Sequence, residues 1–448
     1  MQQTQQTNWH TLIVGLGKTG LSIARYLSAN DVSFAVMDTR LNPPGLDVLA
    51  EEFPAVAQYF GDLSAEVMCR SQRIILSPGI ALATPAIEKA RSLGIEVIGD
   101  IELFAREARA PIISITGSNG KTTVTTLVDR MAKQAGVKVA TGGNIGMPAL
   151  ALLNQRKAEL YVLELSSFQL ETTDSLKSRA ACILNISEDH LDRYAGRLDL
   201  YAAAKAKIYD NCAVKIVNRD DTNVVNIASD SRAVTFGSGP TYHGHYGVIV
   251  DGKQRWLARG EEKLLNTSEM KVAGSHNEVN ALAAMALAEA VDLDQDACLE
   301  VIKSFEGLEH RTQWVGEHNG INWYNDSKGT NVGATVAALQ GLPGKTVLLA
   351  GGQGKDADFS PLADVVQKYA RAVVLFGEDA EQIALALKGD IPIVFAKDMK
   401  DAVVQAKGLA SIGDNVLLSP ACASFDMFDN YEQRGHVFMD TVKREVLC

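Results

Sequence analysis

Short apolar runs alternate with amphipathic stretches along the first hundred residues. Apolar runs at 10–14, 33–38 and 73–77 predict strands, and the stretch 19–29 has the apolar spacing of a helix. Strands that alternate with helices are typical of a parallel sheet covered by helices. We therefore expect a Rossmann-like α/β domain over residues 1–100.

A second region starts at Gly99-Asp100, where an amphipathic helix over 101–109 ends at Pro111. An apolar run follows and breaks into glycines, which predicts a strand, a loop and a helix start. The later elements predicted here are two strands, a helix, a group of hairpins and a buried alanine-rich helix, at 160–164, 181–185, 198–210, 238–265 and 277–291. This pattern predicts a mixed α/β domain over residues 101–307.

The last third of the chain returns to a regular alternation. Beyond a boundary near 305–310, strands that alternate with helices are predicted at 321–324, 346–350, 372–376, 393–395 and 416–419. We expect a second Rossmann-like domain over residues 308–448. The length agrees, because 448 residues at about 150 per domain suggest about three domains.

Composition and charge narrow the possible partners. Hydrophobic residues make up 46% and charged residues 22% of the chain, which is ordinary for globular proteins, and the net charge is -11. Nucleic acid is therefore not expected as a partner, because binding to its backbone draws on clustered Lys and Arg. The cysteines are Cys69, Cys182, Cys212, Cys298, Cys422 and Cys448. They show no CxxC spacing, so we expect reduced packing residues rather than a zinc site or a disulfide framework.

We expect no export signal at the start of this sequence. Residues 1–8 have neither a basic segment nor an apolar one, and no apolar run reaches the roughly 18 residues of a membrane span. We therefore expect a cytoplasmic protein without membrane insertion, and a monomer as the default state.

The apolar run at 112–116 leads into a loop that is suited to phosphate. Glycines let backbone N–H groups close on phosphate oxygens, and the following helix adds the positive end of its dipole. Lys121 supplies a mobile cation, and the Thr122 hydroxyl can bind Mg²⁺. A strict Walker A sequence would have glycine in place of Ile115, so this loop is a shortened variant. ATP binding is the favoured interpretation, and a glycine-rich turn before a structural helix is the alternative.

A second glycine-rich loop lies in the first domain. Gly15-Leu16-Gly17-Lys18-Thr19-Gly20 is a GxGxxG sequence, and Asp38 ends the next strand about twenty residues later. Alone, this pattern indicates NAD and hence an oxidoreductase. The same tight turn and helix N-terminus would suit the diphosphate of a nucleotide sugar equally well, and packing without a ligand is a third possibility.

Polar residues follow several strands, at the edge where α/β sheets bind ligands. Glu164 at a strand end is a natural Mg²⁺-side carboxylate, and His190 is either a metal ligand or a packing residue. Lys205, in the helix predicted over 198–210, is by default a surface charge. Cys422 has no identifiable base beside it, so packing is favoured over a nucleophilic role.

The third domain opens with further candidates. The planar fork of arginine suits His310-Arg311 to a phosphate oxygen, although a surface pair is the more frequent case. The segment 326–331 places a carboxylate, an ammonium and hydroxyls directly after a strand. This density of polar groups favours a binding site.

Taken in this order, these pieces resemble the Mur ligases of bacterial peptidoglycan synthesis, and the match covers nearly the whole chain. The motifs that carry it are Thr116-Gly117-x-Asn119-Gly120-Lys121-Thr122, Glu164, Asn185 with His190, Asn277, His310-Arg311 and Asp326-x-Lys328. Two further stretches, 36–40 with 43–45 and 418–426 with 432–435, are similar to the members that add D-glutamate. Members that add L-alanine, the third residue or the terminal dipeptide, and folylpolyglutamate synthases, share the central motifs but not both stretches.

The resemblance implies an ATP-dependent ligase that joins D-glutamate to UDP-N-acetylmuramoyl-L-alanine through an acyl phosphate. It also implies a UDP-binding first domain, a P-loop ATPase-like central domain and a third domain that closes on them. The GxGxxG loop is thereby reassigned from a dinucleotide to UDP. An NAD-dependent oxidoreductase, based on that loop alone, and a nucleotide-sensing binding protein are the alternatives.

The family pattern assigns residues to each ligand. The ATP-binding residues would be Gly117, Ser118, Asn119, Gly120, Lys121, Thr122, Thr123, Asn277, His310, Arg311 and Asp326. The UDP-substrate would contact Gly17, Thr19, Asp38, Thr39, Arg40, Gly79, Asn144 and His190. D-Glutamate would contact Lys328, Thr330, Lys355, Ser424 and Tyr431.

The resemblance also implies a metal site. Two Mg²⁺ ions would be held by Thr122, Glu164, His190 and Lys205, and the catalytic residues would be Lys121, Glu164, His190 and Lys205. Lys205 would be carbamylated, because CO₂ on a neutral amine turns a cation with a pKa of about 10.4 into an oxygen-bearing anion. This replaces the surface interpretation of Lys205. The chain departs from the usual pattern at Gln353, where similar ligases have aspartate, and at Tyr431, where phenylalanine is frequent.

Overall fold

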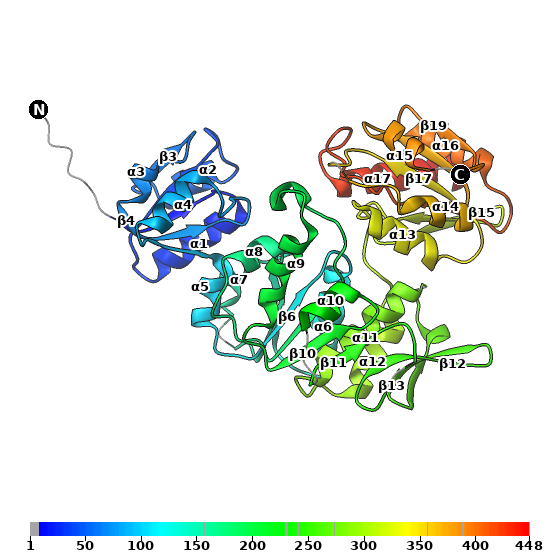
Figure 1. Cartoon of the computed structure of the whole chain (residues 1–448), viewed down its shortest axis with the longest axis horizontal. Helices are drawn as coiled ribbons and strands as arrows, with labels where there is room; N and C mark the ends of the chain where they lie inside the picture. The colour runs from blue at the N-terminus through cyan, green and yellow to red at the C-terminus, as the bar shows by residue number, and fades with distance from the viewer. Residues whose placement is uncertain are drawn as a thin grey trace, which may run out of the picture.

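The computed structural model describes residues 9–155, 157–228, 232–240, 242–272, 274–355, 357–387 and 389–447. These residues form three lobes in sequence order, which run from blue through green to yellow and red in Figure 1. The expectations for residues 1–8 and for Cys448 lie outside the described residues. Within the described ranges, no helix is long and apolar enough to cross a membrane.

The first lobe is a five-stranded sheet in the order β3-β2-β1-β4-β5, in which every neighbouring pair is parallel. The strands are β1 (Trp9–Val14), β2 (Phe34–Asp38), β3 (Ala57–Phe60), β4 (Ser71–Leu76) and β5 (Glu96–Gly99). The helices are α1 (Lys18–Ala29), α2 (Leu46–Glu52), α3 (Ala65–Met68) and α4 (Pro85–Ser92). Leu12 and Ile13 point to opposite faces of β1 and are both fully buried, because helices cover both sides of a parallel sheet.

The middle lobe contains a six-stranded parallel sheet in the order β11-β10-β9-β6-β8-β7 and a three-stranded antiparallel sheet. The strands are β6 (Ile112–Thr116), β7 (Val139–Gly143), β8 (Leu160–Glu164), β9 (Ala180–Ile183), β10 (Val214–Asn218), β11 (Val234–Phe236), β12 (Tyr246–Asp251), β13 (Gln254–Arg259) and β14 (Glu262–Asn266). The helices are α5 (Asp100–Glu107), α6 (Lys121–Gln134), α7 (Ala149–Leu152), α8 (Ser167–Glu171), α9 (Leu198–Ala206), α10 (Thr222–Ala228), α11 (Ser275–Glu289) and α12 (Gln295–Ser304), with short 3-10 turns η1 (Leu191–Tyr194), η2 (Lys207–Tyr209) and η3 (Thr267–Glu269).

The third lobe is a six-stranded sheet in the order β15-β16-β20-β17-β18-β19, parallel except for the edge strand β15. The strands are β15 (Gln313–His318), β16 (Ile321–Asn325), β17 (Thr346–Gly351), β18 (Ala370–Phe376), β19 (Ile393–Phe395) and β20 (Asn415–Leu418). The helices are α13 (Val332–Gly341), α14 (Leu362–Tyr369), α15 (Ala380–Ala386), α16 (Met399–Leu409) and α17 (Tyr431–Val442), which continues into the π-turn Lys443–Leu447.

The predicted α/β fold class is confirmed. Most element boundaries differ from those expected by one or two residues, and two elements near the phosphate loop end earlier than expected. The strand expected over 181–185 ends at Ile183, because both the main chain and the side chain of Asn185 bind the neighbouring loop. The helix expected over 198–210 is α9 followed by the 3-10 turn Lys207–Tyr209.

The first and middle lobes share a buried hydrophobic cluster that includes Ile13 and Leu150, and polar contacts also join the lobes. The side-chain amides of Asn119 and Asn331 pair between the middle and third lobes, at 3.3 and 3.1 Å. The first lobe joins the middle lobe where Gly99 N donates to Thr172 O at 3.2 Å. The contact between the middle and third lobes therefore lies at the phosphate loop itself.

Candidate active site

The phosphate loop runs from β6 to α6, as expected. Gly117 and Gly120 have φ of 153° and 81°, and a Cβ at Gly120 would lie 2.7 Å from Asn280 Oδ1. No side chain caps the start of α6, so its first N–H groups remain for an anion. Asn119 N donates to Asn185 Oδ1 at 2.8 Å, which ties the loop to the end of β9. The loop is thus a cradle for phosphate with a fixed shape.

Lys121 occupies the first position of α6. Its Nζ donates to Gly117 O at 2.6 Å and to Ser118 O at 2.8 Å, so the side chain lies over its own loop. Burial lowers the pKa of Lys121, while the carboxylate of Glu164 opposes this effect. Because a hydrogen bond between two charged groups is stronger than one to a carbonyl, a phosphate oxygen would compete well for this ammonium.

Lys205 on α9 is buried, with 1% of its surface exposed. Its Nζ donates to Gly117 O at 3.0 Å and to Thr116 Oγ1 at 3.3 Å, and it lies 4.5 Å from the ring centre of Tyr201. Burial lowers its pKa well below the usual value for lysine. The surface position expected from spacing alone is therefore wrong, because the face of α9 that carries Tyr201 packs toward the phosphate loop.

Glu164 ends β8 with 1% of its surface exposed. Its Oε1 accepts a hydrogen bond from Asn144 Nδ2 at 2.9 Å, whereas Oε2 is buried and has no hydrogen-bond partner among the described residues. A buried carboxylate oxygen without a hydrogen-bond partner lowers the stability of the fold unless a cation binds to it. Since carboxylate oxygens are preferred ligands of Mg²⁺, this position fits the ion.

His190 precedes η1 in a left-handed conformation, with φ of 55°. Its Nε2 lies 3.7 Å from Asp189 Oδ1, and its ring packs edge-on against Phe168 with centroids 5.0 Å apart. Partial burial lowers the pKa of His190; the negative charge of Asp189 opposes this effect, and the positive charge of Lys355 in the third lobe adds to it. A lowered pKa favours the neutral imidazole, which is the form that binds a metal ion.

Two residues of the third lobe reach toward the phosphate loop. Arg311 donates from Nη2 to Thr122 Oγ1 at 2.5 Å. Asp326, directly after β16, accepts hydrogen bonds from Ser419 Oγ at 2.7 Å and from Thr312 N at 3.0 Å. Burial raises the pKa of Asp326 to about 6. The guanidinium of Arg311 therefore contacts the first turn of α6, and Asp326 lines the same cavity as Asn119 and Gly120 of the phosphate loop.

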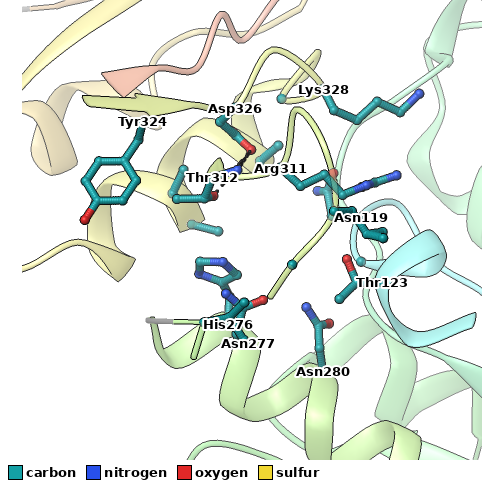
Figure 2. A pocket seen from close by; sticks show the side chains of 18 of the residues that line it. Asn119, Thr123, His276, Asn277, Asn280, Arg311, Thr312, Tyr324, Asp326 and Lys328 are labelled. Carbon is teal, nitrogen blue, oxygen red and sulfur yellow. Dashed lines mark hydrogen bonds between the residues drawn. The ribbon is translucent and has the colours of Figure 1, made fainter. Parts of the chain in front are cut away.

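A cavity of about 570 Å³ lies between α11, the phosphate loop and the third lobe. In Figure 2, Asn277 and Asn280 rise from α11 on one side, and Arg311 and Asp326 face them from the other. The volume suits a small-molecule ligand. The residues expected to bind ATP that line this cavity are Asn119, Gly120, Thr123, Asn277, Arg311 and Asp326. His276 and Asn280 also line it, although the sequence had not singled them out.

The residues expected to bind D-glutamate lie in two groups of the third lobe. Lys328 Nζ is 3.7 Å from the ring centre of Tyr431, and Thr330 N donates to Lys328 O at 2.8 Å. Burial lowers the pKa of Lys328 to about 8. The second group comprises the buried Ser424 and the exposed Lys355. The positive charge of Lys355 is one of the groups that lower the pKa of His190 in the middle lobe.

The GxGxxG loop of the first lobe joins β1 to α1. A Cβ at Gly20 would lie 2.1 Å from Gly15 O, so helix and strand can pack this closely only with glycine there. Asp38 accepts hydrogen bonds from Leu16 N and from the main chain and guanidinium of Arg40. Burial would raise the pKa of Asp38, but these hydrogen bonds lower it. Both oxygens of this carboxylate are therefore engaged, and Asp38 holds the GxGxxG loop and Arg40 in place.

The other residues expected at the UDP-substrate are divided between two lobes. A Cβ at Gly17 or at Gly79 would have no neighbour within 4 Å, so packing alone does not require either glycine. Thr19 is half-buried, and Thr39 and Arg40 are exposed at the same end of the sheet. Asn144 and His190 belong to the middle lobe.

Glu309, His310 and His436 form a group with ligand atoms within 4.8 Å of one another. Asn325 Oδ1 accepts a hydrogen bond from Ser327 N at 3.0 Å, which leaves Asn325 Nδ2 to donate to His310 Nδ1 at 2.8 Å. A neutral His310 then carries its proton on Nε2 and has no lone pair left for a metal ion. We therefore assign no metal to this group.

Two buried residues that the sequence analysis missed hold the site together. Tyr201 OH lies 3.2 Å from Ser118 Oγ in the phosphate loop. Arg434, fully buried on α17, donates to Ser327 O at 2.8 Å and to Cys422 O at 3.1 Å. Cys422 itself is buried, and burial raises its pKa to about 12, as for a packing residue. Tyr201 has no local signal in the sequence. Arg434 lies in the stretch 432–435 that carries the resemblance, but the sequence did not show its tertiary contacts.

Comparisons with known proteins identify three family domains in order along the chain. The matches are Mur ligase MurD-like, N-terminal domain over residues 9–99, Mur ligase middle domain over 115–288, and Mur ligase, glutamate ligase domain over 310–422. A UDP-N-acetylmuramoylalanine--D-glutamate ligase from Nitrosococcus oceani is 50% identical over 441 residues, which cover 98% of this chain and 97% of that protein. The ligase of the same name from Pseudomonas aeruginosa is 50% identical over 437 residues, which cover 96% and 97%.

Solved structures are similar in fold. UDP-N-acetylmuramate-alanine ligase MurC from Thermotoga maritima has a TM-score of 0.58 at 19% identity and covers 98% of this chain and 100% of that one. A pseudomurein peptide ligase type C from Methanothermus fervidus has a TM-score of 0.60 at 18% identity and covers 92% and 96%. These identities support the fold alone, whereas the curated relatives and the three domain matches confirm the resemblance of the motifs: the chain belongs to the Mur ligase family.

Proposed function

We propose that this protein joins D-glutamate to the alanyl carboxylate of UDP-N-acetylmuramoyl-L-alanine, with ATP, in the synthesis of peptidoglycan precursors. One observation carries the proposal: Lys121, Lys205 and Arg311 converge on one phosphate loop, beside a cavity of about 570 Å³. The identity of 50% with D-glutamate ligases over 98% of the chain supports the choice of substrates.

The chemistry must activate a carboxylate that is inert toward amines. A carboxylate oxygen attacks the γ-phosphorus of ATP, the bond to ADP breaks, and an acyl phosphate forms. The amine of D-glutamate then attacks the acyl carbon and loses a proton, and inorganic phosphate leaves with the electrons of the broken C–O bond. Lys121 and Arg311 offset the negative charge that gathers in the transition state. Holding the amine against the acyl phosphate supplies an effective molarity of about 10⁵ to 10⁸ M.

ATP and Mg²⁺ are the cofactors of the family. When bound, Mg²⁺ supplies positive charge at the phosphoryl oxygens. We assign its ligands, in two ion sites, to Thr122, Glu164, His190 and Lys205. The unpartnered Oε2 of Glu164 and the lowered pKa of His190 support this assignment.

We assign a carbamate to Lys205. The modification needs a neutral amine, and burial lowers the pKa of Lys205 well below its usual value. The amine nitrogen would attack CO₂ and lose a proton, which leaves an anionic group with two oxygens. This step would convert a buried amine, which donates to Gly117 O and Thr116 Oγ1, into an oxygen ligand for Mg²⁺.

The nucleotide substrate would span the first and middle lobes. Its UDP part is assigned to Gly17, Thr19, Asp38, Thr39, Arg40 and Gly79. The open space at Gly17 and Gly79 supports that part of the assignment. Asn144 and His190 are assigned to the muramoyl-alanine end, and the hydrogen bond from Asn144 to Glu164 supports their position beside the metal.

D-Glutamate would bind on the third lobe, at Lys328, Thr330, Lys355, Ser424 and Tyr431. The ammonium groups of Lys328 and Lys355 match the two carboxylates of the amino acid. The remaining ATP contacts are assigned to the phosphate loop, Asn277, His310, Arg311 and Asp326, most of which line the cavity in Figure 2.

We divide the chain into domains of residues 1–100, 101–307 and 308–448. The first sheet ends at Gly99, α12 ends at Ser304 and the third sheet starts at Gln313, which supports both divisions. A monomer in the cytoplasm is part of the same proposal. Light scattering of the purified protein and cell fractionation test these two points.

The test is phosphate release with UDP-N-acetylmuramoyl-L-alanine, ATP and Mg²⁺ across a panel of amino acids. We expect release that depends on D-glutamate, with little stimulation by L-alanine or a diamino acid. Equal stimulation by those amino acids would contradict the assigned specificity. ATP binding without product under any amino acid would favour a nucleotide sensor, and substrate-dependent reduction of NAD would favour an oxidoreductase.

A further inference from the structure

Arg193 connects two lobes and has no role in the assignments above. It lies in η1, three residues after His190, and 14% of its side chain is exposed. Its Nη1 donates to Pro78 O at 3.2 Å, and its Nη2 donates to Ile80 O at 3.0 Å. A single guanidinium of the middle lobe therefore holds the two carbonyl groups that flank Gly79 in the first lobe.

The other side of Arg193 is fixed on α8. Its Nη2 also donates to Glu171 Oε2 at 3.3 Å, and its Cζ lies 4.6 Å from the ring centre of Phe168. The same Phe168 ring packs against His190, with centroids 5.0 Å apart. Arg193 is therefore held by α8, whose Phe168 also packs against His190. From there its guanidinium extends to the first lobe.

The contacts with Pro78 and Ile80 fix the direction of peptide planes. The described residues contain no cis peptide bond, and in a trans peptide the N–H points opposite to the carbonyl. The carbonyl of Pro78 faces Arg193, so the N–H of Gly79 is directed away from it. Ser77 Oγ donates to Gly15 O at 2.9 Å, which ties this turn to the GxGxxG loop on its other side.

We infer that Arg193 is a positioning residue that sets the spacing between the turn 78–80 and His190, and so favours a substrate that contacts both. The inference rests on the proposed function, because that function supplies a substrate with a UDP part and a distant acyl end. UDP alone would contact only the first lobe and would not depend on this spacing. The planar fork of arginine suits the task, since it can bind both carbonyls and Glu171 at once.

The test compares Arg193→Ala and Arg193→Lys with Arg197→Ala in the full-length protein. Arg197 is a matched control, because it lies on the same segment but its side chain is 60% exposed and pairs with the exposed Asp199. For each variant, steady-state kinetics give KM for the three substrates. Calorimetry gives Kd for UDP and for UDP-N-acetylmuramoyl-L-alanine. Thermal unfolding verifies that each variant is folded.

In Arg193→Ala we expect KM and Kd for the UDP-substrate to rise about 10- to 100-fold. The KM values for ATP and D-glutamate and the Kd for UDP alone should stay within about threefold of wild type. Arg193→Lys should lie between, because a lysine keeps the charge but loses the fork. Arg197→Ala should match the wild type.

An unchanged Kd for the UDP-substrate in Arg193→Ala would overturn the inference. An equal loss of affinity for UDP alone, or an equal rise of all three KM values, would also overturn it, because either result indicates a general structural role. The calorimetric comparison needs no turnover. If wild type binds the UDP-substrate but releases no phosphate, the proposed function fails while the comparison of Kd values still decides the role of Arg193.

Discussion

The glycine-rich loops of the first and middle lobes both run from a buried parallel strand into a helix without a side-chain cap. Both use glycine where a Cβ would collide, at Gly20 with Gly15 O and at Gly120 with Asn280. Both therefore present helix N–H groups to an anion. Their backbones alone would predict the same ligand chemistry, namely a phosphate.

The two loops differ in the charged groups around them. In the first lobe, Asp38 is fully engaged by the loop and by Arg40, and the lysine of the loop, Lys18, is exposed. In the middle lobe, Lys121 and Lys205 both donate to the carbonyl of Gly117. The first arrangement can hold a diphosphate at rest, whereas the second can stabilise a phosphoryl group in transfer. The side chains supplied by other elements therefore decide what each loop does.

Replacement of the lysine in each loop should separate these roles most strongly. Lys121→Ala should lower kcat/KM about 10³-fold, because it removes a cation next to the phosphoryl group. Lys18→Ala, in the exposed corresponding position of the first loop, should change it less than about threefold. The measurement is phosphate release in the presence of D-glutamate. Similar losses of kcat/KM in both variants would contradict the difference in function between the two loops.

Lys205→Ala should lower the rate about 10²- to 10³-fold, because an oxygen ligand is lost from the metal site. Short carboxylic acids added to the reaction should restore part of the activity, since they can supply that oxygen. Lys207→Ala is the control, because Lys207 binds Glu171 O and Asp174 outside the phosphate loop. Turnover by Lys205→Ala at the wild-type rate, without added acid, would remove the carbamate from the proposal.

Asp38→Asn should act on the first loop alone. The substitution removes the charge that holds Leu16 N and Arg40, so KM for the UDP-substrate should rise about tenfold while KM for ATP stays unchanged. Asp62→Asn, at an exposed position of the same lobe, is the matched control. A rise in KM for ATP of the same size would contradict the assignment of the UDP-substrate to the first loop and of ATP to the middle loop.

The pH dependence of D-glutamate binding gives the smallest effect. Burial lowers the pKa of Lys328 to about 8, so its ammonium is charged below that pH and loses its proton as the pH rises through it. KM for D-glutamate should therefore increase several-fold between about pH 7 and pH 9, with less change in KM for the UDP-substrate. Lys328→Arg should shift the increase to higher pH, since arginine stays charged. Identical profiles for both proteins would argue against a carboxylate contact at Lys328.

The sequence was sufficient for the fold class and for the elements that carry the loops. The apolar runs before Gly15 and Gly117 are long enough to indicate buried strands, and glycines mark the turns that follow. The position of Lys205 could not be predicted from spacing. Its helix reads Leu-Asp-Leu-Tyr-Ala-Ala-Ala-Lys-Ala, and such an alanine-rich segment has no clear polar face to show which side is buried.

Contacts between distant segments could not be predicted from the sequence for a different reason. The contacts of Arg193, Arg434 and Tyr201 could not be predicted, because partners of these side chains lie 83 to 115 residues away in the sequence. An arginine in a short turn or on a helix is usually solvated, and only the packed lobes show that these side chains are held inside. The motifs therefore indicated the chemistry, and the tertiary structure added the residues that position it.

The most direct test of the central claim is the fate of oxygen in the reaction. UDP-N-acetylmuramoyl-L-alanine with oxygen-18 in its alanyl carboxylate is incubated with ATP, Mg²⁺ and D-glutamate, and the released phosphate is analysed by mass spectrometry. If the middle loop transfers a phosphoryl group to the carboxylate, one labelled oxygen appears in each phosphate when the acyl phosphate is broken by the amine. Unlabelled phosphate, with amide product formed, would contradict the account.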